Sequence, residues 1–346
     1  MKSDDIIGVV PPLLIQNTDI FVCPSCNGAL NVSRDQHMIK CSKCNQSFKC
    51  EKGIPLLFWP NEWDSKIDVT GAVKSFYEEN PYPGYENIDS DQSLRQKAEK
   101  GIFARLLDEQ IIHGAKILEV GCGTGQLSNF LGMTWGRAVF ATDICLNSLR
   151  LGYDFKENNQ IDNVAFLQMN LFRPAFRPDS FDLVICNGVL HHTSDPLGGF
   201  KSITKLVKKG GVIIVGLYNR FGRISTDIRR LIFRLSDNHF KYLDASLRDQ
   251  NLSDVRKHIW FMDQYKNPHE SKHTIGEVLG WFDQSEVEFI NSIPKSTAFA
   301  TFATQEELFK ANPRGTRLDH FLAQFGILLS GGREGGFFIM IGRKKA

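Results

Sequence analysis

The chain has 346 residues, with 41 Lys and Arg, 39 Asp and Glu, and a formal net charge of +2. This near-neutral charge excludes a generally polybasic nucleic-acid-binding protein, although it allows a local basic patch. The 42% of hydrophobic and 23% of charged residues exclude a disordered or fibrous chain. The length predicts two domains, or one large domain with an appendage.

No segment has the run of about 18 apolar residues that a membrane-spanning helix needs, so we expect no membrane span. The first residues, MKSDDIIGVVPPLL, carry two acids and lack a long apolar run with a cleavage site, so they do not resemble a secretory signal. A cytoplasmic location is the resulting expectation. The eight cysteines would stay reduced there and need an explanation other than disulfides.

Four of these cysteines form two close pairs, Cys23 with Cys26 and Cys41 with Cys44. Their spacing, C-x2-C-x14-C-x2-C, is close to that of zinc sites built from two thiolate knuckles. Zn²⁺ prefers four soft ligands in a tetrahedron, so the pattern predicts a structural zinc ion. Residues 29–40 between the pairs predict a hairpin, which would complete a zinc ribbon. A redox dithiol pair is the alternative.

Segment 21–58 contains both knuckles and then the turn Gly53-Ile54-Pro55. It resembles the small zinc-ribbon modules that occur as methyltransferase activator subunits or ahead of methyltransferase domains. After a linker at 60–69, the stretch SFYEENPYPGYEN (75–87) predicts an ordered turn. This stretch resembles segments that precede some bacterial methyltransferase domains, which implies a position over the cofactor pocket. A packed interdomain loop is the alternative.

Residues 92–112 then predict one amphipathic helix, with apolar residues at helical spacing. Farther along, apolar segments of strand length alternate with helical stretches. These segments are 115–120, 138–143, 164–169, 181–188 and 211–218. The alternation predicts an α/β fold with a parallel, doubly wound sheet, in which ligands bind beyond the carboxyl ends of the strands.

A glycine-rich loop, residues 121–125, follows the first of these segments. Its third glycine comes one residue earlier than in the dinucleotide fingerprint G-x-G-x-x-G, and Gln126 takes that place. With the preceding acid Glu119, the loop favours a ligand that has an amino-acid tail and no phosphate. Asp143 ends the second segment about 20 residues farther on, the spacing of an acid that binds ribose hydroxyls.

The segments LEVGCGTGQLS, ATD and FDLVICNGVLHHTSDP resemble, in order, the main motifs of the class I S-adenosylmethionine-dependent methyltransferases. The resemblance covers residues 100–219 and implies a Rossmann-like sheet of seven strands. Its last two strands, at 286–294 and 335–345, would form an antiparallel hairpin.

The motif positions imply residues that bind S-adenosylmethionine, whose product is S-adenosylhomocysteine. They are Glu119, Gly121, Gly123, Gly125, Asp143, Ile144, Asn170, Leu171, Asn187 and Gly188. By the same resemblance, the glycines and Glu119 would contact the methionine end, and Asp143 would bind the ribose. Ile144, Asn170 and Leu171 would flank the adenine. Family members often carry Asp where this chain has Asn170, although an asparagine can still bond an adenine amino group.

Methyl transfer needs a base only when the acceptor carries a proton at attack. The candidates near the carboxyl edge of the sheet are His191, His192 and Tyr218. Histidine suits this role because it titrates near neutrality. The alternative is that the HHTSDP segment only opens the next helix, which Thr193 or Ser194 would cap.

Two stretches, 219–285 and 295–334, are too long for simple connections and predict helical insertions. Residues 219–243 predict an amphipathic helix with an Arg-rich face, which fits either an anionic acceptor or a solvated surface. A polar cluster follows within 263–274 and could line the acceptor pocket. It contains Asp263, Tyr265, His269, Glu270 and His273.

Together these features predict a zinc ribbon at 1–60, a linker with an aromatic lid segment at 61–100, and a class I methyltransferase domain at 101–346. The expected function is methyl transfer from S-adenosylmethionine to a small-molecule metabolite. One alternative is an RNA or protein methyltransferase that binds its substrate through the ribbon and the Arg-rich insertion. Another is a non-catalytic regulatory protein that binds S-adenosylmethionine. The acceptor atom and the oligomeric state are not predicted.

Overall fold

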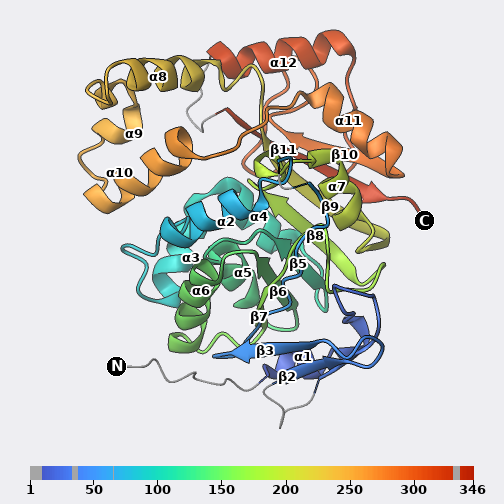
Figure 1. Ribbon diagram of the computed structural model, residues 1–346. Coiled ribbons are helices and arrows are strands. Elements are labelled where there is room, and N and C mark those ends of the chain that lie inside the picture. The colour runs from blue at the N-terminus through green and yellow to red at the C-terminus, as the bar shows by residue number, and fades with distance from the viewer. Residues whose placement is uncertain (1–9, 33–37, 65, 330–335) are drawn as a thin grey trace.

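The chain forms two separate sheets (Figure 1). The computed structural model describes residues 10–32, 38–64, 66–329 and 336–346. The smaller sheet is antiparallel, and its strands follow one another in sequence order. They are β1 (Leu30–Asn31), β2 (Met38–Cys41), β3 (Ser47–Glu51) and β4 (Ile54–Pro55). The predicted hairpin therefore forms, although residues 33–37 at its tip lie outside the described residues.

The larger sheet has seven strands in the order β10-β11-β9-β8-β5-β6-β7. Their bounds are β5 (Lys116–Val120), β6 (Ala138–Asp143), β7 (Val164–Gln168), β8 (Phe181–Asn187), β9 (Val207–Tyr218), β10 (Val287–Ile293) and β11 (Phe337–Lys344). Strands β5 to β9 pair in parallel, and β11 pairs antiparallel with both β9 and β10. This topology confirms the predicted doubly wound sheet with an antiparallel final hairpin.

Helices cover both faces of this sheet because successive strand residues point to opposite sides. Ile117 packs with α4 (Ile102–Gln110), α5 (Gln126–Gly132) and α6 (Leu146–Asn158) in one apolar layer. Its neighbour Leu118 belongs to the opposite layer, with α7 (Pro196–Thr204) and α11 (Ile275–Gln284). The central residues of the parallel strands are mostly apolar, as expected of a parallel sheet that is buried on both faces.

The N-terminal segment covers part of the sheet where a helix is missing. No helix occurs in residues 169–180, which connect the parallel strands β7 and β8. The segment containing α1 (Pro12–Ile15) packs there instead, and the Phe21 ring lies 6.0 Å from Phe140 and 5.1 Å from Phe176. Leu56, just after β4, also bridges Gln168 at the edge of β7. The small sheet and the large sheet thus share one core.

The prediction of a single helix over 92–112 is wrong. The structure has α3 (Asp91–Lys100) and α4, with Gly101 between them as the C-cap of one and the N-cap of the other. The backbone of Gly101 is extended, with φ −86° and ψ 108°, so the helical hydrogen bonding stops there. The apolar spacing continued across the break and concealed it.

The first predicted insertion is largely helical, whereas in the second only Arg317–Leu329 form a helix and residues 295–316 are turns and irregular chain. The first contains α8 (Ile224–Leu235), α9 (Ala245–Arg248), α10 (Asp254–Phe261) and a π-helical turn at Met262–Lys266. It extends from one end of the large sheet, above α2 (Thr70–Glu79) in Figure 1. The second contains α12 (Arg317–Leu329), and its residues 330–334 lie outside the described residues. Within the described ranges, no helix combines the length and the apolar character needed to cross a bilayer.

The burial of α8 does not follow its apolar spacing. Most of its apolar stripe points outward, and Ile228, Leu231 and Leu235 are 56%, 58% and 79% exposed. Phe233 is instead the buried residue, packed against Phe261 and Tyr265. The predicted helix therefore forms, and its spacing alone does not show which face is buried.

Candidate active site and metal centre

A cavity of about 770 Å³ lies at the carboxyl ends of the central strands. Most residues assigned to the cofactor from the motifs line it. They are Glu119, Gly121, Gly123, Asp143, Ile144, Asn170, Leu171, Asn187 and Gly188. Gly125 is not among the lining residues, and a Cβ there would come within 2.3 Å of the Phe166 ring. Its role in the structure is therefore close packing of the loop against the sheet.

The glycine-rich loop between β5 and α5 takes a conformation that disfavours larger residues. Gly121 and Gly123 have φ of 70° and 55°, a left-handed backbone that costs glycine little. A Cβ on Gly123 would lie 2.1 Å from the backbone oxygen of Tyr82. The loop thus allows another backbone segment to approach closely at the rim of the cavity.

Two carboxyl groups stand beside this loop, the buried Glu119 and the half-buried Asp143. Burial raises the pKa of Glu119 to about 7, although the Ser128 hydroxyl donates to the same carboxyl group. Burial also raises the pKa of Asp143, whose two oxygens accept from Gly123 N at 2.8 Å and Cys145 N at 2.9 Å. Each oxygen of Asp143 retains a lone pair for a further donor, as a ribose hydroxyl would supply.

Asn170, at the end of β7, uses its side chain within the protein. Its Nδ2 donates to Trp59 O at 2.9 Å and to Asn61 Oδ1 at 2.8 Å. Its Oδ1 accepts from Phe172 N at 3.1 Å. The side chain therefore anchors the chain that follows the small sheet, a contact that the motif position did not predict.

The aromatic segment expected near the cofactor does cover the cavity. Within residues 70–87, here called the covering segment, Val73, Tyr77 and Tyr82 line it. Glu78 attaches α2 to the N-terminus of α6, because its two oxygens accept from Leu146 N and Asn147 N, each at 2.8 Å. A carboxylate is stabilised at that position by the helix dipole.

The two neighbouring histidines occupy different surroundings. His192 lines the cavity and its Nδ1 lies 2.7 Å from His269 O, so Nδ1 carries the proton and Nε2 is left as an acceptor. Burial lowers its pKa, which keeps the ring neutral near pH 7. His191 is fully buried outside the cavity lining, and neither ring nitrogen has a partner among the described residues.

Tyr218, at the end of β9, lies between charged and aromatic groups. The Arg223 guanidinium is 3.8 Å from the centre of its ring, and the His191 ring is 4.1 Å away on centroids. Its hydroxyl accepts from Gln264 Nε2 at 2.9 Å. Burial raises its pKa well above the usual range, so the phenol keeps its proton.

The first insertion supplies cavity residues that the motifs did not identify. Asp263 and Gln264, from the π-helical turn, line the cavity together with Ser246 and Trp260. The polar cluster at 263–274 indicated only Asp263 among these. π-Helical turns often occur at functional sites because they redirect side chains within a helix.

One cation was also missed. Lys97 of α3 lines the cavity, and its Nζ donates to Gln126 Oε1 at 2.6 Å, beside the glycine-rich loop. Burial lowers its pKa. No motif could have indicated it, because α3 precedes the sheet and meets the loop only in the folded chain.

Much of the Arg-rich face of the insertion is paired with acids of the same insertion. Arg223 and Arg230 both contact Glu270, which is itself buried, and the contact from Arg230 measures 3.0 Å. Arg229 lies 3.8 Å from Asp244. These pairs hold α8 to the segments that follow it and take up three of the positive charges expected to face an anionic acceptor.

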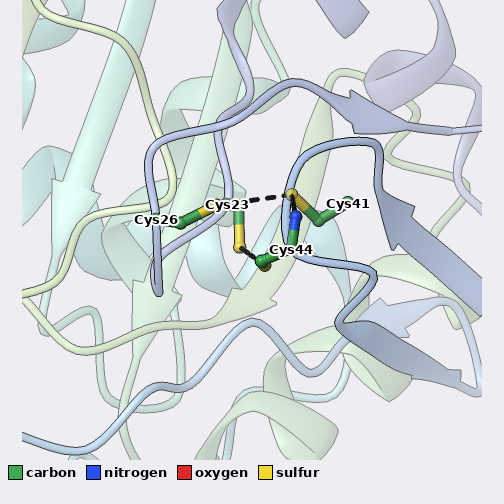
Figure 2. A group of neighbouring side chains, drawn as sticks. All are labelled: Cys23, Cys26, Cys41 and Cys44. Atoms are coloured by element: carbon green, nitrogen blue, oxygen red, sulfur yellow. Dashed lines mark hydrogen bonds between the residues drawn. The ribbon is translucent and has the colours of Figure 1, made fainter.

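The four knuckle cysteines converge on one point (Figure 2). Their sulfur atoms all lie within 4.8 Å of one another, with Cys23 and Cys44 at 3.7 Å and Cys26 and Cys41 at 3.5 Å. A tetrahedral Zn²⁺ with bonds of about 2.3 Å separates its sulfurs by about 3.8 Å, so the donor set fits that ion. Among the described residues this is the one group of three or more potential ligands that share a point.

Comparison with known proteins identifies the central segment. Residues 118–215 match the family described as "Methyltransferase domain", which confirms the resemblance carried by the glycine-rich loop and the following motifs. An uncharacterized protein from Synechococcus is 25% identical over 198 residues, which cover 51% of this chain and 48% of the relative. A ubiquinone biosynthesis O-methyltransferase from Xanthomonas campestris is 32% identical over 109 residues, covering 31% and 44%.

The chain thus spans about half the length of the curated relatives it matches. A similar solved structure is the complex between the Haloferax volcanii Trm112 methyltransferase activator and the putative methyltransferase. That match has 13% identity and a TM-score of 0.44, and it covers 83% of this chain and 100% of the other.

Proposed function

We propose that this chain, whose residues 118–215 form a methyltransferase domain, transfers a methyl group from S-adenosylmethionine to a small-molecule acceptor. The observation that carries the proposal is the cavity at the carboxyl ends of β5, β6 and β8, where the glycine-rich loop, Glu119 and Asp143 meet. This is the place at which doubly wound sheets bind their ligands.

The cavity residues suit the parts of S-adenosylmethionine. Glu119 would face the ammonium group of the methionine end, and Lys97 would face its carboxylate. Asp143 would accept hydrogen bonds from the ribose hydroxyls. The hydrogen bonds that it accepts from Gly123 N and Cys145 N would hold the loop in place. Asn187, whose Oδ1 is buried without a partner among the described residues, would accept a hydrogen bond near the transferred methyl group.

The chain's own part in catalysis is positioning and proton removal. S-Adenosylmethionine supplies an electrophilic methyl group, and holding donor and acceptor in line removes as much as about 7–11 kcal/mol of barrier. The neutral His192, with Nδ1 fixed by His269 O, would accept the acceptor's proton at Nε2. Tyr218 would orient the acceptor through its hydroxyl proton, since the oxygen already accepts from Gln264.

A small molecule is favoured as the acceptor because the covering segment and the first insertion both line the cavity. Tyr77 of α2 donates to Asp263 of the insertion at 2.8 Å, which joins the two across the cavity. The pairing of Arg223, Arg229 and Arg230 with acids also leaves less charge for a nucleic acid. The four cysteines would hold a structural zinc ion.

The test is transfer of labelled methyl from S-adenosylmethionine into a cell extract that has been separated into nuclease-treated, protease-treated and small-molecule fractions. We expect label in the small-molecule fraction. Label that disappears with nuclease or protease would favour a macromolecular substrate. Binding of S-adenosylmethionine with no transfer into any fraction would favour a regulatory role.

A further inference from the structure

Asp263 is a third acid in the cavity, apart from Glu119 and Asp143 at the strand ends. It comes from the π-helical turn of the first insertion and is 6% exposed. Its Oδ1 accepts from Tyr77 at 2.8 Å and its Oδ2 accepts from Gln264 at 2.9 Å. Each oxygen can accept one more hydrogen bond, so the carboxylate can bind a ligand that is also a donor.

The negative charge of Asp263 lacks a salt bridge among the described residues. The Arg223 guanidinium, which stacks on Tyr218, pairs with Glu270 instead. A carboxylate that lines a cavity without a bound cation favours a positively charged ligand, because an ion pair in a partly desolvated site is stronger than one in water.

Aromatic rings line the cavity together with this carboxylate. Tyr77, Tyr82, Tyr218, Trp260 and Phe337 all line the same cavity. The rings of Tyr77 and His192, of His192 and Tyr218, and of Tyr218 and Phe337 lie 6.0 Å apart on centroids, so they form a continuous wall. Burial and the charge of Asp263 raise the pKa values of Tyr77, Tyr82 and Tyr218.

We propose that Asp263 and these rings bind a protonated amine, and that the acceptor of the methyl group is therefore an amine nitrogen. Rings whose faces attract a cation, combined with one carboxylate, are the arrangement by which proteins recognise ammonium groups. The inference rests on the proposed methyltransferase function and names the substrate class of that site.

The reaction balances as an N-methylation. The ammonium group loses one proton to Nε2 of His192, and the freed nitrogen lone pair attacks the methyl carbon. The N–C bond forms as the S–C bond breaks, and its electron pair stays on sulfur to give neutral S-adenosylhomocysteine. The positive charge thus passes from sulfur to nitrogen, beside Asp263.

The sulfonium of S-adenosylmethionine is itself a cation and could use the same site. The first measurement therefore compares binding of S-adenosylmethionine with that of S-adenosylhomocysteine, which lacks the charge. The second titrates protein loaded with S-adenosylhomocysteine with phenethylamine, which is charged at pH 7.5, and with its neutral isostere 2-phenylethanol. Both are run on the unaltered chain, on Asp263→Asn and on Asp283→Asn.

We expect the unaltered chain to bind phenethylamine at least tenfold more tightly than 2-phenylethanol. Asp263→Asn should abolish this preference and leave the affinity ratio of the two cofactor forms unchanged. Asp283→Asn should match the unaltered chain, since Asp283 is 58% exposed and pairs with Arg314 on the surface. Thermal unfolding checks that each variant folds.

The proposal is overturned if the unaltered chain shows no amine preference while it binds S-adenosylmethionine. It is also overturned if Asp263→Asn weakens the binding of S-adenosylmethionine tenfold or more relative to that of S-adenosylhomocysteine. The carboxylate would then bind the sulfonium of the cofactor. Failure of the unaltered chain to bind either cofactor form would instead contradict the proposed function.

Discussion

The side-chain nitrogen of Asn170 donates to the backbone oxygen of Trp59 at 2.9 Å, which ties the end of β7 to the chain that leaves the small sheet. The same nitrogen donates to Asn61. A position that the motifs assign to the adenine therefore also joins the two sheets. The N-terminal segment and the cavity are linked through this one side chain.

Replacing Asn170 by Asp should lower the free energy of unfolding by about 1–3 kcal/mol, because Trp59 O and Asn61 Oδ1 would lose their donor and face a carboxylate. Urea unfolding of the variant measures this. Asn163→Asp, at the opposite end of β7, removes one longer bond to Gly132 O and should cost less. An unchanged stability in Asn170→Asp would contradict the anchoring role.

Replacing Asp143 by Ala should weaken the binding of S-adenosylmethionine by about 10-fold to 150-fold. This is the range expected when a hydrogen bond to a charged group is lost. The substitution also removes the acceptor for Gly123 N and Cys145 N, which hold the loop. Calorimetric titration gives the affinity. Asp162→Ala is the control, since Asp162 is exposed and does not line the cavity. If the two variants bind S-adenosylmethionine equally well, Asp143 does not bind the cofactor.

Replacing His192 by Gln should lower kcat by about 10²–10⁴-fold while the affinity for S-adenosylmethionine changes little. His191→Phe keeps an aromatic ring at the buried position and should cause a much smaller loss. The comparison needs a turnover assay on an identified acceptor. A larger loss in His191→Phe than in His192→Gln would reverse the roles proposed for the two histidines.

Glu119 predicts a specific dependence of stability on pH. Its pKa rises from 4.5 to about 7 in the folded chain, so between these values the folded state holds a proton that the unfolded state has released. The free energy of unfolding should therefore fall by about 3 kcal/mol as pH rises from about 4.5 to about 7. Glu119→Gln should lack this contribution, and urea unfolding across the pH range tests it.

The same carboxyl group predicts proton release on cofactor binding. The ligand's ammonium group favours the ionised form of Glu119, so binding near pH 6.5 should release a proton, and affinity should rise with pH up to about 7. Calorimetry in buffers of different ionisation enthalpy measures the released proton. If Glu119→Gln releases as many protons as the unaltered chain, the proton comes from another group.

Metal analysis should find about one zinc per chain, and Cys41→Ser should lose it. Because the small sheet shares a core with β6 and β7, we expect loss of zinc to lower the melting temperature of the whole chain. Cys186→Ala, at a buried cysteine far from the knuckles in sequence, should keep the zinc. A chain that keeps its zinc content and melting temperature in Cys41→Ser would contradict the metal centre.

Local sequence patterns predicted the parts of the fold that depend on neighbouring residues. The apolar segments predicted the strand positions to within a few residues. The glycine-rich loop predicted one side of the cavity, because a strand and the turn that follows it lie close together in the sequence. The break at Gly101 was missed, since a single extended glycine leaves the apolar spacing of both helices intact.

Contacts between distant segments were not predictable in the same way. Phe21 belongs to the core beside Phe140, and Tyr77 bonds to Asp263, yet no periodicity relates these positions. The orientation of α8 likewise depends on distant segments. Its spacing shows that one face is apolar, whereas in the structure Phe233 packs on Phe261 and Tyr265.

The shared core has a consequence for the order in which the chain folds during synthesis. Phe21 leaves the ribosome roughly 120 residues before Phe140, a delay of about 6–24 s at ordinary elongation rates. During that time the large sheet has not been made, so the small sheet would lack the apolar partners that cover it in the complete chain. If the four cysteines bind zinc, the ion would stabilise the small sheet during this delay.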